Sequence, residues 1–241
     1  MASQNAPATL VTRREPMLIN VEDAYSTQHF SLPQHYEGTI ESILIPAGLI
    51  KDRIERVARD IRSDYYGKTV HLMCVLKGGA AYFNDLLEAL RNIHDYGRGE
   101  YIPVTYDFIT CKSYEGTSST GSVAVTGGNL EGLKGKHVLL VEDIIDTGAT
   151  MAKVVPLLES HGASSVRVTN LLEKRRDDGE CHYTGDYVGF SIPDKFVVGY
   201  CLDYQEVYRD MMHIAIINAE GIEKVISLNT AAASCALCLL L

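Results

Sequence analysis

The sequence is short of positive charge. It carries 22 Lys and Arg residues against 31 Asp and Glu residues, which gives a formal net charge of -9. Because affinity for a nucleic-acid backbone depends on clustered Lys and Arg, this balance argues against a general nucleic-acid binder. An anionic ligand would have to be held by local features instead, such as helix N-termini, glycine turns, a few well-placed cations or a divalent metal.

Paired cysteine motifs and long apolar runs are lacking too. The six cysteines form no pair of C-x-x-C motifs and lack the density of a secreted disulfide scaffold, so free thiols in a reducing compartment are the simpler interpretation. No apolar run reaches the ~20 residues that cross a bilayer, and no signal-peptide pattern opens the chain. These absences predict a cytoplasmic protein with no nucleic-acid partner.

The composition that remains is that of an ordinary globular protein. Of the 241 residues, 46% are hydrophobic and 22% are charged, which suffices for one substantial core. No internal repeat, linker or charge run divides the chain. We expect an N-terminal arm over residues 1–31, one domain over residues 32–226, and a tail over residues 227–241 that packs or stays disordered.

Hydrophobic periodicity predicts alternating strands and helices. Apolar residues recur at helical spacing over Gly48–Ile61, and Val70–Leu76 is a continuous apolar run typical of a buried strand. Gly78 and Gly79 then break the strand, and helical spacing returns over Ala80–Leu90. A strand, a glycine turn and a helix in this order make a βα unit.

A second βα unit follows later in the chain. The apolar run His137–Val141 ends in acidic residues, turns through Asp146-Thr147-Gly148, and continues into a helix in which Pro156 should cause a kink or an early end. Strands alternating with helices predict an α/β fold with a parallel sheet covered on both faces. Further strands are expected at Val104–Ile109, Val166–Leu172, Phe196–Tyr200 and His213–Ile217.

The polar stretch Lys112–Asn129 is too long for a simple hairpin turn. Its Ser, Thr and Gly content suits an active-site lid, and it suits an ordinary solvated surface loop as well. Taken alone, the ordinary loop is the more common of the two.

The segment Val138–Thr150 has the composition of a ligand site. Glu142 and Asp143 come at the carboxyl end of a predicted strand, where ligands bind in open α/β sheets. The following turn and helix start, with Thr147 and Thr150, offer backbone N–H groups, hydroxyls and the positive end of a helix dipole to a phosphate. Carboxylates repel phosphate but suit ribose hydroxyls or Mg²⁺. A sugar phosphate satisfies both halves.

This segment resembles the phosphoribosyl-pyrophosphate-binding motif of type I phosphoribosyltransferases, and its flanks resemble the hypoxanthine-guanine branch of that family. The resemblance runs from about Tyr36 to Ile222 and includes Leu76-Lys77-Gly78-Gly79, Lys112-Ser113-Tyr114, Leu171–Arg175 and Lys195–Tyr204. It implies a type I phosphoribosyltransferase fold, with a central mostly parallel sheet flanked by helices, a small hood region and a flexible active-site lid. It also implies a purine-salvage enzyme that uses Mg²⁺ and transfers the 5-phosphoribosyl group from phosphoribosyl pyrophosphate to hypoxanthine or guanine, giving IMP or GMP and pyrophosphate.

The resemblance assigns roles to individual residues. Asp146 is the general base that removes the proton from the purine N7, and Lys174 donates to the exocyclic O6, which selects a 6-oxo over a 6-amino purine. Glu142 and Asp143 face the ribose hydroxyls and the metal, and Asp203 is a further metal-linked carboxylate. The remaining substrate-binding residues are Thr147, Gly148, Ala149 and Thr150 for the 5-phosphate, Lys195, Phe196 and Val197 for the base, Lys77, Gly78 and Arg209 for the pyrophosphate, and Ser113 and Tyr114 in the lid.

Two features depart from the family pattern or lie beside it. The family commonly has Lys in the phosphate loop where this chain has Ala149, so we expect a weaker grip on the sugar phosphate. The family also suggests a cis peptide bond between Leu76 and Lys77. At the other end, Cys238-Leu239-Leu240-Leu241 fits a prenylation box, with Cys235 as a second acylation site; an unmodified apolar extension is the more common explanation of so short a motif. A membrane partner is expected only if Cys238 is prenylated.

Other interpretations remain open from the residues alone. A non-catalytic regulator could use the same pocket to sense nucleotides, but such proteins usually have a basic face or a degraded base, and the net charge of -9 together with Asp146 argues against both. A relative that prefers xanthine or a pyrimidine is not excluded by Lys174. The family suggests a homodimer or a homotetramer.

Overall fold

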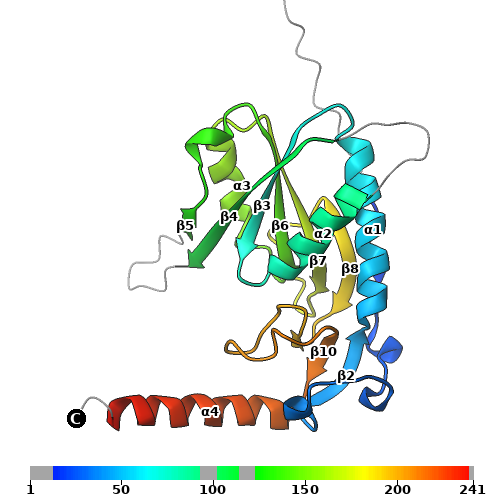
Figure 1. The fold of residues 1–241 in the computed structure, drawn as a ribbon, viewed down its shortest axis with the longest axis vertical. Helices are drawn as coiled ribbons and strands as arrows, with labels where there is room; N and C mark the ends of the chain where they lie inside the picture. Colours follow the sequence, from blue (N-terminus) through cyan, green and yellow to red (C-terminus); the bar gives the residue numbers. More distant parts are fainter. Residues whose placement is uncertain (1–12, 93–101, 114–122, 239–241) are drawn as a thin grey trace, which may run out of the picture.

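The computed structural model describes residues 13–92, 102–113 and 123–238, with only the backbone described at 112, 113, 123 and 231–238. Its centre is a seven-stranded sheet of order β1-β8-β7-β6-β3-β4-β5, parallel except for β5, which runs antiparallel to β4 (Figure 1). The strands are β1 (Met17–Leu18), β3 (Val70–Leu76), β4 (Val104–Ser113), β5 (Val123–Gly127), β6 (His137–Ile145), β7 (Ser165–Arg175) and β8 (Tyr187–Pro193).

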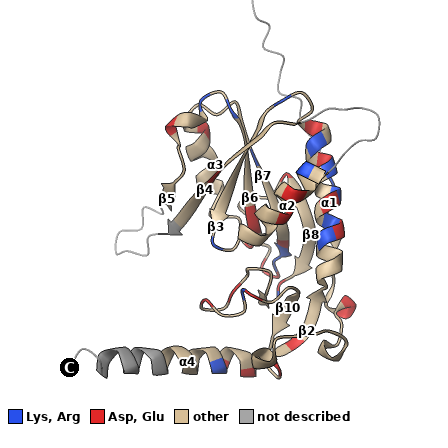
Figure 2. Cartoon of the chain, viewed as in Figure 1, with Lys and Arg blue, Asp and Glu red and all other residues tan. Residues whose placement is uncertain are grey.

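Helices cover both faces of this sheet. On one face, α1 (Ala47–Asp64) and α2 (Ala80–Asn92) bury their apolar stripes against β3, β6 and β8, and on the other α3 (Met151–Ser160) packs against β7 and β5. Strands covered on both faces must be apolar on both, which explains the continuous apolar runs of β3 and β6. Acidic and basic residues are interspersed along α1 (Figure 2).

A smaller antiparallel sheet lies across the carboxyl ends of the parallel strands (Figure 1). Its order is β2-β10-β9, from β2 (Ile40–Ile45), β10 (Ile214–Ile217) and β9 (Val197–Val198). It has an apolar cluster of its own that includes Tyr36, Tyr208 and Val225. We call this sheet and the loop 199–213 between its last two strands the hood. Short 3-10 helices lie at Val21–Asp23, Thr27–His29, Gln34–Tyr36 and Glu131–Leu133.

The described ends of the chain pack differently. At the N-terminal end, β1 pairs with β8, and Arg175 donates to the Ile19 carbonyl oxygen over 2.7 Å. At the other end, α4 (Ala219–Cys238) starts on the hood, where Val225 is buried, and extends away from the sheet (Figure 1). The expected boundary at residue 226 lies within this helix. Among the described residues, no helix is both long and apolar enough to cross a membrane.

The predicted fold class is confirmed, and most elements lie where the periodicity placed them. The strand at 70–76 and the helices at 48–61 and 80–90 match β3, α1 and α2. The strand expected at 137–141 continues to Ile145. Pairing with β7 continues through Ile145, so the polar residues Glu142 and Asp143 belong to the strand. The α3 helix runs through Pro156 without ending there.

Two expectations were wrong in detail. The stretch 112–129 is not one loop, because 112–113 complete β4 and 123–127 form β5; the expected lid itself, 114–122, lies outside the described residues. The strand expected at 196–200 shortens to Val197–Val198, since the positive φ of Gly199 and Tyr200 ends it. The periodicity also did not predict β2 or β8.

Candidate active site

The turn between β6 and α3 forms a hollow of about 270 Å³ at the mouth of the sheet. Its lining includes Glu142 and the whole run from Ile144 to Met151. Gly148 has φ +77°, and a Cβ on it would lie 2.4 Å from the carbonyl oxygen of Tyr183, so only glycine fits there. The Ala149 N–H donates to Thr147 Oγ1 over 3.3 Å. The turn thus gathers backbone N–H groups and hydroxyls at the N-terminus of α3, the arrangement that binds phosphate.

Two carboxyl groups lie above this turn on β6. Glu142 is buried, and burial raises its pKa well above the ordinary value, with the hydrogen bond and the charge of Asp143 adding to the effect. Burial therefore favours the neutral form of Glu142, which lowers the negative charge beside Asp143. Asp143 also faces the loop after β3: a Cβ on Gly78 would lie 1.8 Å from Asp143 Oδ2. Gly78 is therefore required for the close approach of that loop, which includes the expected cis bond between Leu76 and Lys77.

Asp146 and Lys174 meet at the edge of the hollow. Lys174 Nζ donates to Asp146 Oδ2 over 2.9 Å, and Arg176 donates to Asp146 Oδ1 over 2.9 Å. The Lys174 side chain is 11% exposed and that of Asp146 is 44% exposed. Burial is the largest single influence on the Asp146 pKa and raises it, but the hydrogen bonds and charges of Lys174 and Arg176 together outweigh burial and hold the pKa below its ordinary value.

Cations and carboxylates from the hood and the β3 loop form a second polar group. Arg209 forms an ion pair with Asp203 at 2.7 Å and donates to the Cys201 carbonyl oxygen over 2.6 Å. Glu206 links this pair to the β3 loop, since it accepts from Lys77 over 2.8 Å and from Arg209 over 3.3 Å. The hood loop and the loop after β3 are thereby tied together.

The residues expected at the purine are arranged around β9. Val197 is buried and pairs with Ile216 of β10. Phe196 is 48% exposed, and its ring contacts that of Tyr204 edge to face at 5.4 Å between centroids, so its other side is open to a planar ligand. Lys195 is exposed. Ser113 ends β4, opposite Val123, while Tyr114 lies outside the described residues.

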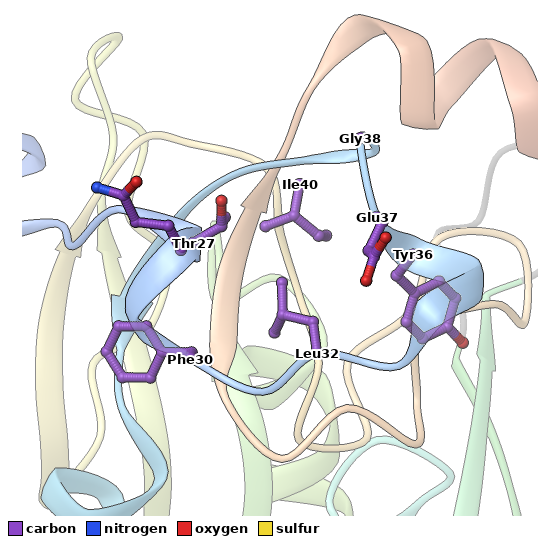
Figure 3. Close-up of a pocket in the computed structure, with 8 residues that line it drawn as sticks. Thr27, Phe30, Leu32, Tyr36, Glu37, Gly38 and Ile40 are labelled. Atoms are coloured by element: carbon purple, nitrogen blue, oxygen red, sulfur yellow. The ribbon is translucent and has the colours of Figure 1, made fainter.

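A second hollow of about 230 Å³ lies between the N-terminal 3-10 helices and β2. Figure 3 shows its lining, with Phe30, Leu32 and Ile40 beside Tyr36 and Glu37. None of the predicted site residues lines it.

Cysteine chemistry does not suit the first hollow. Burial, with a smaller contribution from the charge of Glu142, raises the pKa of Cys111 to about 11. Since the thiolate is the nucleophile, Cys111 is a poor one at neutral pH.

The acidic residues suit a metal that arrives with its ligand. Within 13–92, 102–113 and 123–238, no group of three or more His, Cys, Asp or Glu side chains could hold a metal ion alone. Mg²⁺ commonly takes only one or two protein carboxylates and completes its shell with water and substrate phosphates. The pair Glu142 and Asp143 fits that pattern, as does Asp203, which keeps lone pairs beyond its contacts with Arg209 and the Glu206 N–H.

Sequence reasoning missed two residues of this site, Arg176 and Glu206. Arg176 follows Lys174 by two positions at the end of a strand, and alternate strand residues point to the same side, so this spacing was the available signal. Glu206 had no local signal, because its partners Lys77 and Arg209 come together only in the folded chain.

Comparisons with known proteins agree over most of the chain. A family model described as a phosphoribosyl transferase domain matches residues 43–205. The hypoxanthine-guanine phosphoribosyltransferase of Canis lupus familiaris is 47% identical over 203 residues, covering 83% of this chain and 91% of that protein. The Homo sapiens protein of the same name is 44% identical over 216 residues, covering 88% and 97%. The crystal structure of the Schistosoma mansoni enzyme of that name, in complex with IMP, aligns with a TM-score of 0.70 and 36% identity, covering 86% of this chain and 98% of that one.

Proposed function

The chain belongs to the phosphoribosyl transferase family, and from this premise we propose that it is a purine-salvage enzyme. It transfers the 5-phosphoribosyl group from phosphoribosyl pyrophosphate to hypoxanthine or guanine, and it releases IMP or GMP and pyrophosphate. The observation that carries the proposal is the contact between Asp146 and Lys174 at the edge of the β6–α3 hollow. It places a base and a donor side by side, which is what the N7 and O6 edge of a 6-oxopurine requires.

The donor's sugar phosphate occupies the hollow. The 5-phosphate accepts from the N–H groups and hydroxyls of Thr147, Gly148, Ala149 and Thr150, where the N-terminus of α3 favours negative charge. Glu142 and Asp143 take the ribose hydroxyls. Because burial favours the neutral form of Glu142, the pair repels the neighbouring phosphate less than two exposed carboxylates would.

The base binds between the hood and Asp146. Phe196 stacks on the purine, the Val197 backbone and Lys195 meet its edge, and Lys174 leaves Asp146 to donate to O6. The loss of that hydrogen bond makes Asp146 more basic at the moment when it must act. As the bond from N9 to C1 of the ribose forms and the bond from C1 to the pyrophosphate oxygen breaks, the N7 proton passes to Asp146.

Pyrophosphate leaves from the side of Lys77, Gly78 and Arg209. The ion pairs that hold Lys77 and Arg209 on Glu206 and Asp203 are exposed or half-buried, so two phosphate groups can compete for these cations. Asp203, or Glu142 and Asp143, would hold Mg²⁺, which would supply positive charge for the leaving group. Ser113 and Tyr114 belong to a lid that excludes water from the activated sugar.

One assay tests this function and separates it from its rivals. Purified protein is mixed with Mg²⁺, the donor and each of hypoxanthine, guanine, xanthine and adenine, and nucleoside monophosphate is measured. We expect product from hypoxanthine and guanine, and a loss of roughly 10²- to 10⁴-fold in turnover for Asp146→Asn with donor binding retained. Product from adenine alone would contradict the role of Lys174, product from xanthine alone would identify a xanthine-preferring relative, and nucleotide binding without product from any base would favour a non-catalytic nucleotide sensor.

We also propose a cellular compartment, domain bounds and an oligomeric state for the enzyme. The described cysteines, Cys74, Cys111, Cys181 and Cys201, are all free thiols, which supports action in the reducing cytosol. We place the catalytic domain at residues 32–226, with residues 1–31 as an arm and 227–241 as a tail, and we propose a homodimer or homotetramer. Light scattering measures the oligomer, and mass spectrometry of the native protein detects a lipid on Cys238.

A further inference from the structure

We propose that Arg176 is a positioning residue for Asp146. It holds the Oδ1 atom of that carboxylate, so that Oδ2 stays directed at the purine N7 proton after Lys174 has turned to O6. The proposal rests on the proposed function and adds to it a residue that the recognised motifs leave out.

The guanidinium of Arg176 is fixed on two sides. One nitrogen donates to Asp146 Oδ1 over 2.9 Å. The other edge makes a two-point contact with Asp178, with Nε to Oδ1 at 3.2 Å and Nη2 to Oδ2 at 2.5 Å. A planar guanidinium that Asp178 already holds at two points loses little further freedom when it orients the Asp146 carboxylate, which a lysine cannot match.

The end of β7 places Arg176 and Lys174 on the same carboxylate. Side chains alternate in direction along a strand, so positions 174 and 176 point to one side and position 175 to the other. The contacts agree: Lys174 and Arg176 both reach Asp146, whereas Arg175 donates to Ser191 and to the Ile19 carbonyl oxygen. The two cations occupy different oxygens of Asp146, so one can leave without disturbing the other.

Two cations and three carboxylates meet at Asp146. Lys174 and Arg176 face Asp146 itself, Asp178, and Asp194, whose oxygens lie 3.7 Å from Lys174 Nζ and 3.9 Å from Arg176 Nε. With Lys174 withdrawn to the purine, Arg176 is the remaining cation on Asp146. It keeps the carboxylate ionised and ready to accept a proton.

The contact between Arg176 and Asp178 also connects the purine side of the site to its phosphate side. Asp178 also accepts from the Glu180 N–H over 2.9 Å, and two residues later the His182 N–H donates to the Thr147 carbonyl oxygen over 2.7 Å. The loop after β7 therefore runs from the guanidinium of Arg176 to the phosphate-binding turn. Removal of the Arg176 side chain should first disturb the orientation of Asp146. A disturbance transmitted through the loop to the phosphate-binding turn would change KM for the donor.

Steady-state kinetics of the intact protein test the proposal. For Arg176→Ala with hypoxanthine we expect kcat to fall roughly tenfold, as for a general base held in the wrong direction, while KM for the donor stays within twofold. The acid limb of the kcat/KM profile should move to higher pH, because a cation beside Asp146 is gone. Arg176→Lys keeps the charge, so the limb should stay near the wild-type position while kcat recovers only in part.

A double-mutant cycle separates positioning from general stabilisation. In the Asp146→Asn background, Arg176→Ala should cause no further fall in kcat, since the group it positions is already inactive. The matched control is Arg56→Ala, which removes an exposed arginine that pairs with Asp60 on α1 and should leave kcat and the pH profile unchanged. Thermal unfolding of each variant shows whether it is folded.

The outcomes that overturn the proposal differ from those that overturn the function. If the wild type makes IMP but Arg176→Ala keeps wild-type kcat and an unmoved acid limb, Arg176 has no positioning role. A further fall in kcat in the Asp146→Asn background has the same meaning. Should Arg176→Ala fail to fold, Arg176→Lys decides: wild-type kcat overturns the proposal and a lowered kcat supports it. A wild type inactive with every base overturns the proposed function instead.

Discussion

At the scale of single residues, Asp146 shows how neighbours set the chemistry of a carboxylate. It is half-exposed, and an exposed Asp is a weak base at neutral pH. Two cations lower its pKa further in the free protein. In the proposed mechanism Asp146 becomes more basic only when a purine with an O6 acceptor draws Lys174 away, which would link proton abstraction to the binding of a correct base.

Ala149 is the residue whose replacement should improve the site. Ala149→Lys places a cation where the 5-phosphate binds, so KM for phosphoribosyl pyrophosphate should fall roughly three- to tenfold, the range between an exposed ion pair and a charged hydrogen bond. Steady-state kinetics at low and high salt measure it, because added salt should weaken the gain. Ala149→Met, which adds length without charge, is the control. An unchanged KM for Ala149→Lys would show that the backbone N–H groups already saturate the phosphate.

At the scale of elements, the β6–α3 turn depends on one backbone conformation. Gly148 combines a φ of +77° with Tyr183 backbone atoms so close that a Cβ would lie 2.4 Å from the nearest oxygen. The turn lines the hollow. Because it lies at the N-terminus of α3, it also lies at the positive end of that helix's dipole. Strand, turn and helix must therefore keep their relative positions for phosphate to bind.

Gly148→Ala should disrupt this element. The left-handed conformation alone costs an L-residue about 1 to 2 kcal/mol, and the contact with Tyr183 forces the turn to move as well. We expect KM for the donor to rise at least about tenfold, measured by initial rates. Gly135→Ala is the matched control, since Gly135 has the same φ of +77° but nothing within 4 Å of its Cβ position. It should lose stability, measured by urea unfolding, without a change in KM; a similar rise in KM for both variants would contradict the local explanation.

At the scale of the whole molecule, the parallel sheet and the hood meet around the site. The sheet supplies Glu142, Asp146 and Lys174 at the ends of neighbouring strands, the residue before β9 supplies the Phe196 ring, and the hood supplies Arg209. The contact of Lys77 with Glu206 ties the two parts together. We propose that the substrate binds between them, which would couple binding to the relative position of the two parts.

Stability of the whole chain should fall in mild acid. Burial lowers the pKa of His71, His137 and His213. The unfolded chain takes up protons near pH 6.5, while the folded chain keeps these rings neutral to lower pH. Unfolded molecules then bind more protons, so the free energy of unfolding decreases as pH drops below about 6.5.

Urea unfolding from pH 8 to pH 5 measures how steeply the free energy of unfolding falls with pH, and His71→Gln should make this fall shallower. At pH 8 the side chain at position 71 is neutral in both the wild type and His71→Gln. The difference between their free energies of unfolding at that pH therefore gives the structural cost of the substitution. A slope in His71→Gln as steep as that of the wild type would show that His71 does not contribute.

The sequence by itself determined the βα units and the phosphate-binding turn. Consecutive residues decide both: apolar periodicity fixes which face of a helix or strand is buried, and a phosphate at a helix N-terminus is bound by N–H groups of neighbouring residues. Hence the order of residues is enough to locate α1, α2, β3 and the run Thr147–Thr150. The resemblance to a known family added roles to Asp146 and Lys174 that their own neighbours in the sequence do not imply.

Only the tertiary structure decided which distant residues touch. β5 is a strand because Ile109–Ser113 offers it an edge; its β-branched residues Val123, Val125 and Thr126 favour a strand too, but they lie within a stretch that is polar as a whole. Arg176 reaches Asp146, and Glu206 reaches both Lys77 and Arg209, because strand register and the position of the hood bring them within hydrogen-bond distance. Such contacts depend on the packing of the whole sheet, and no local pattern encodes them.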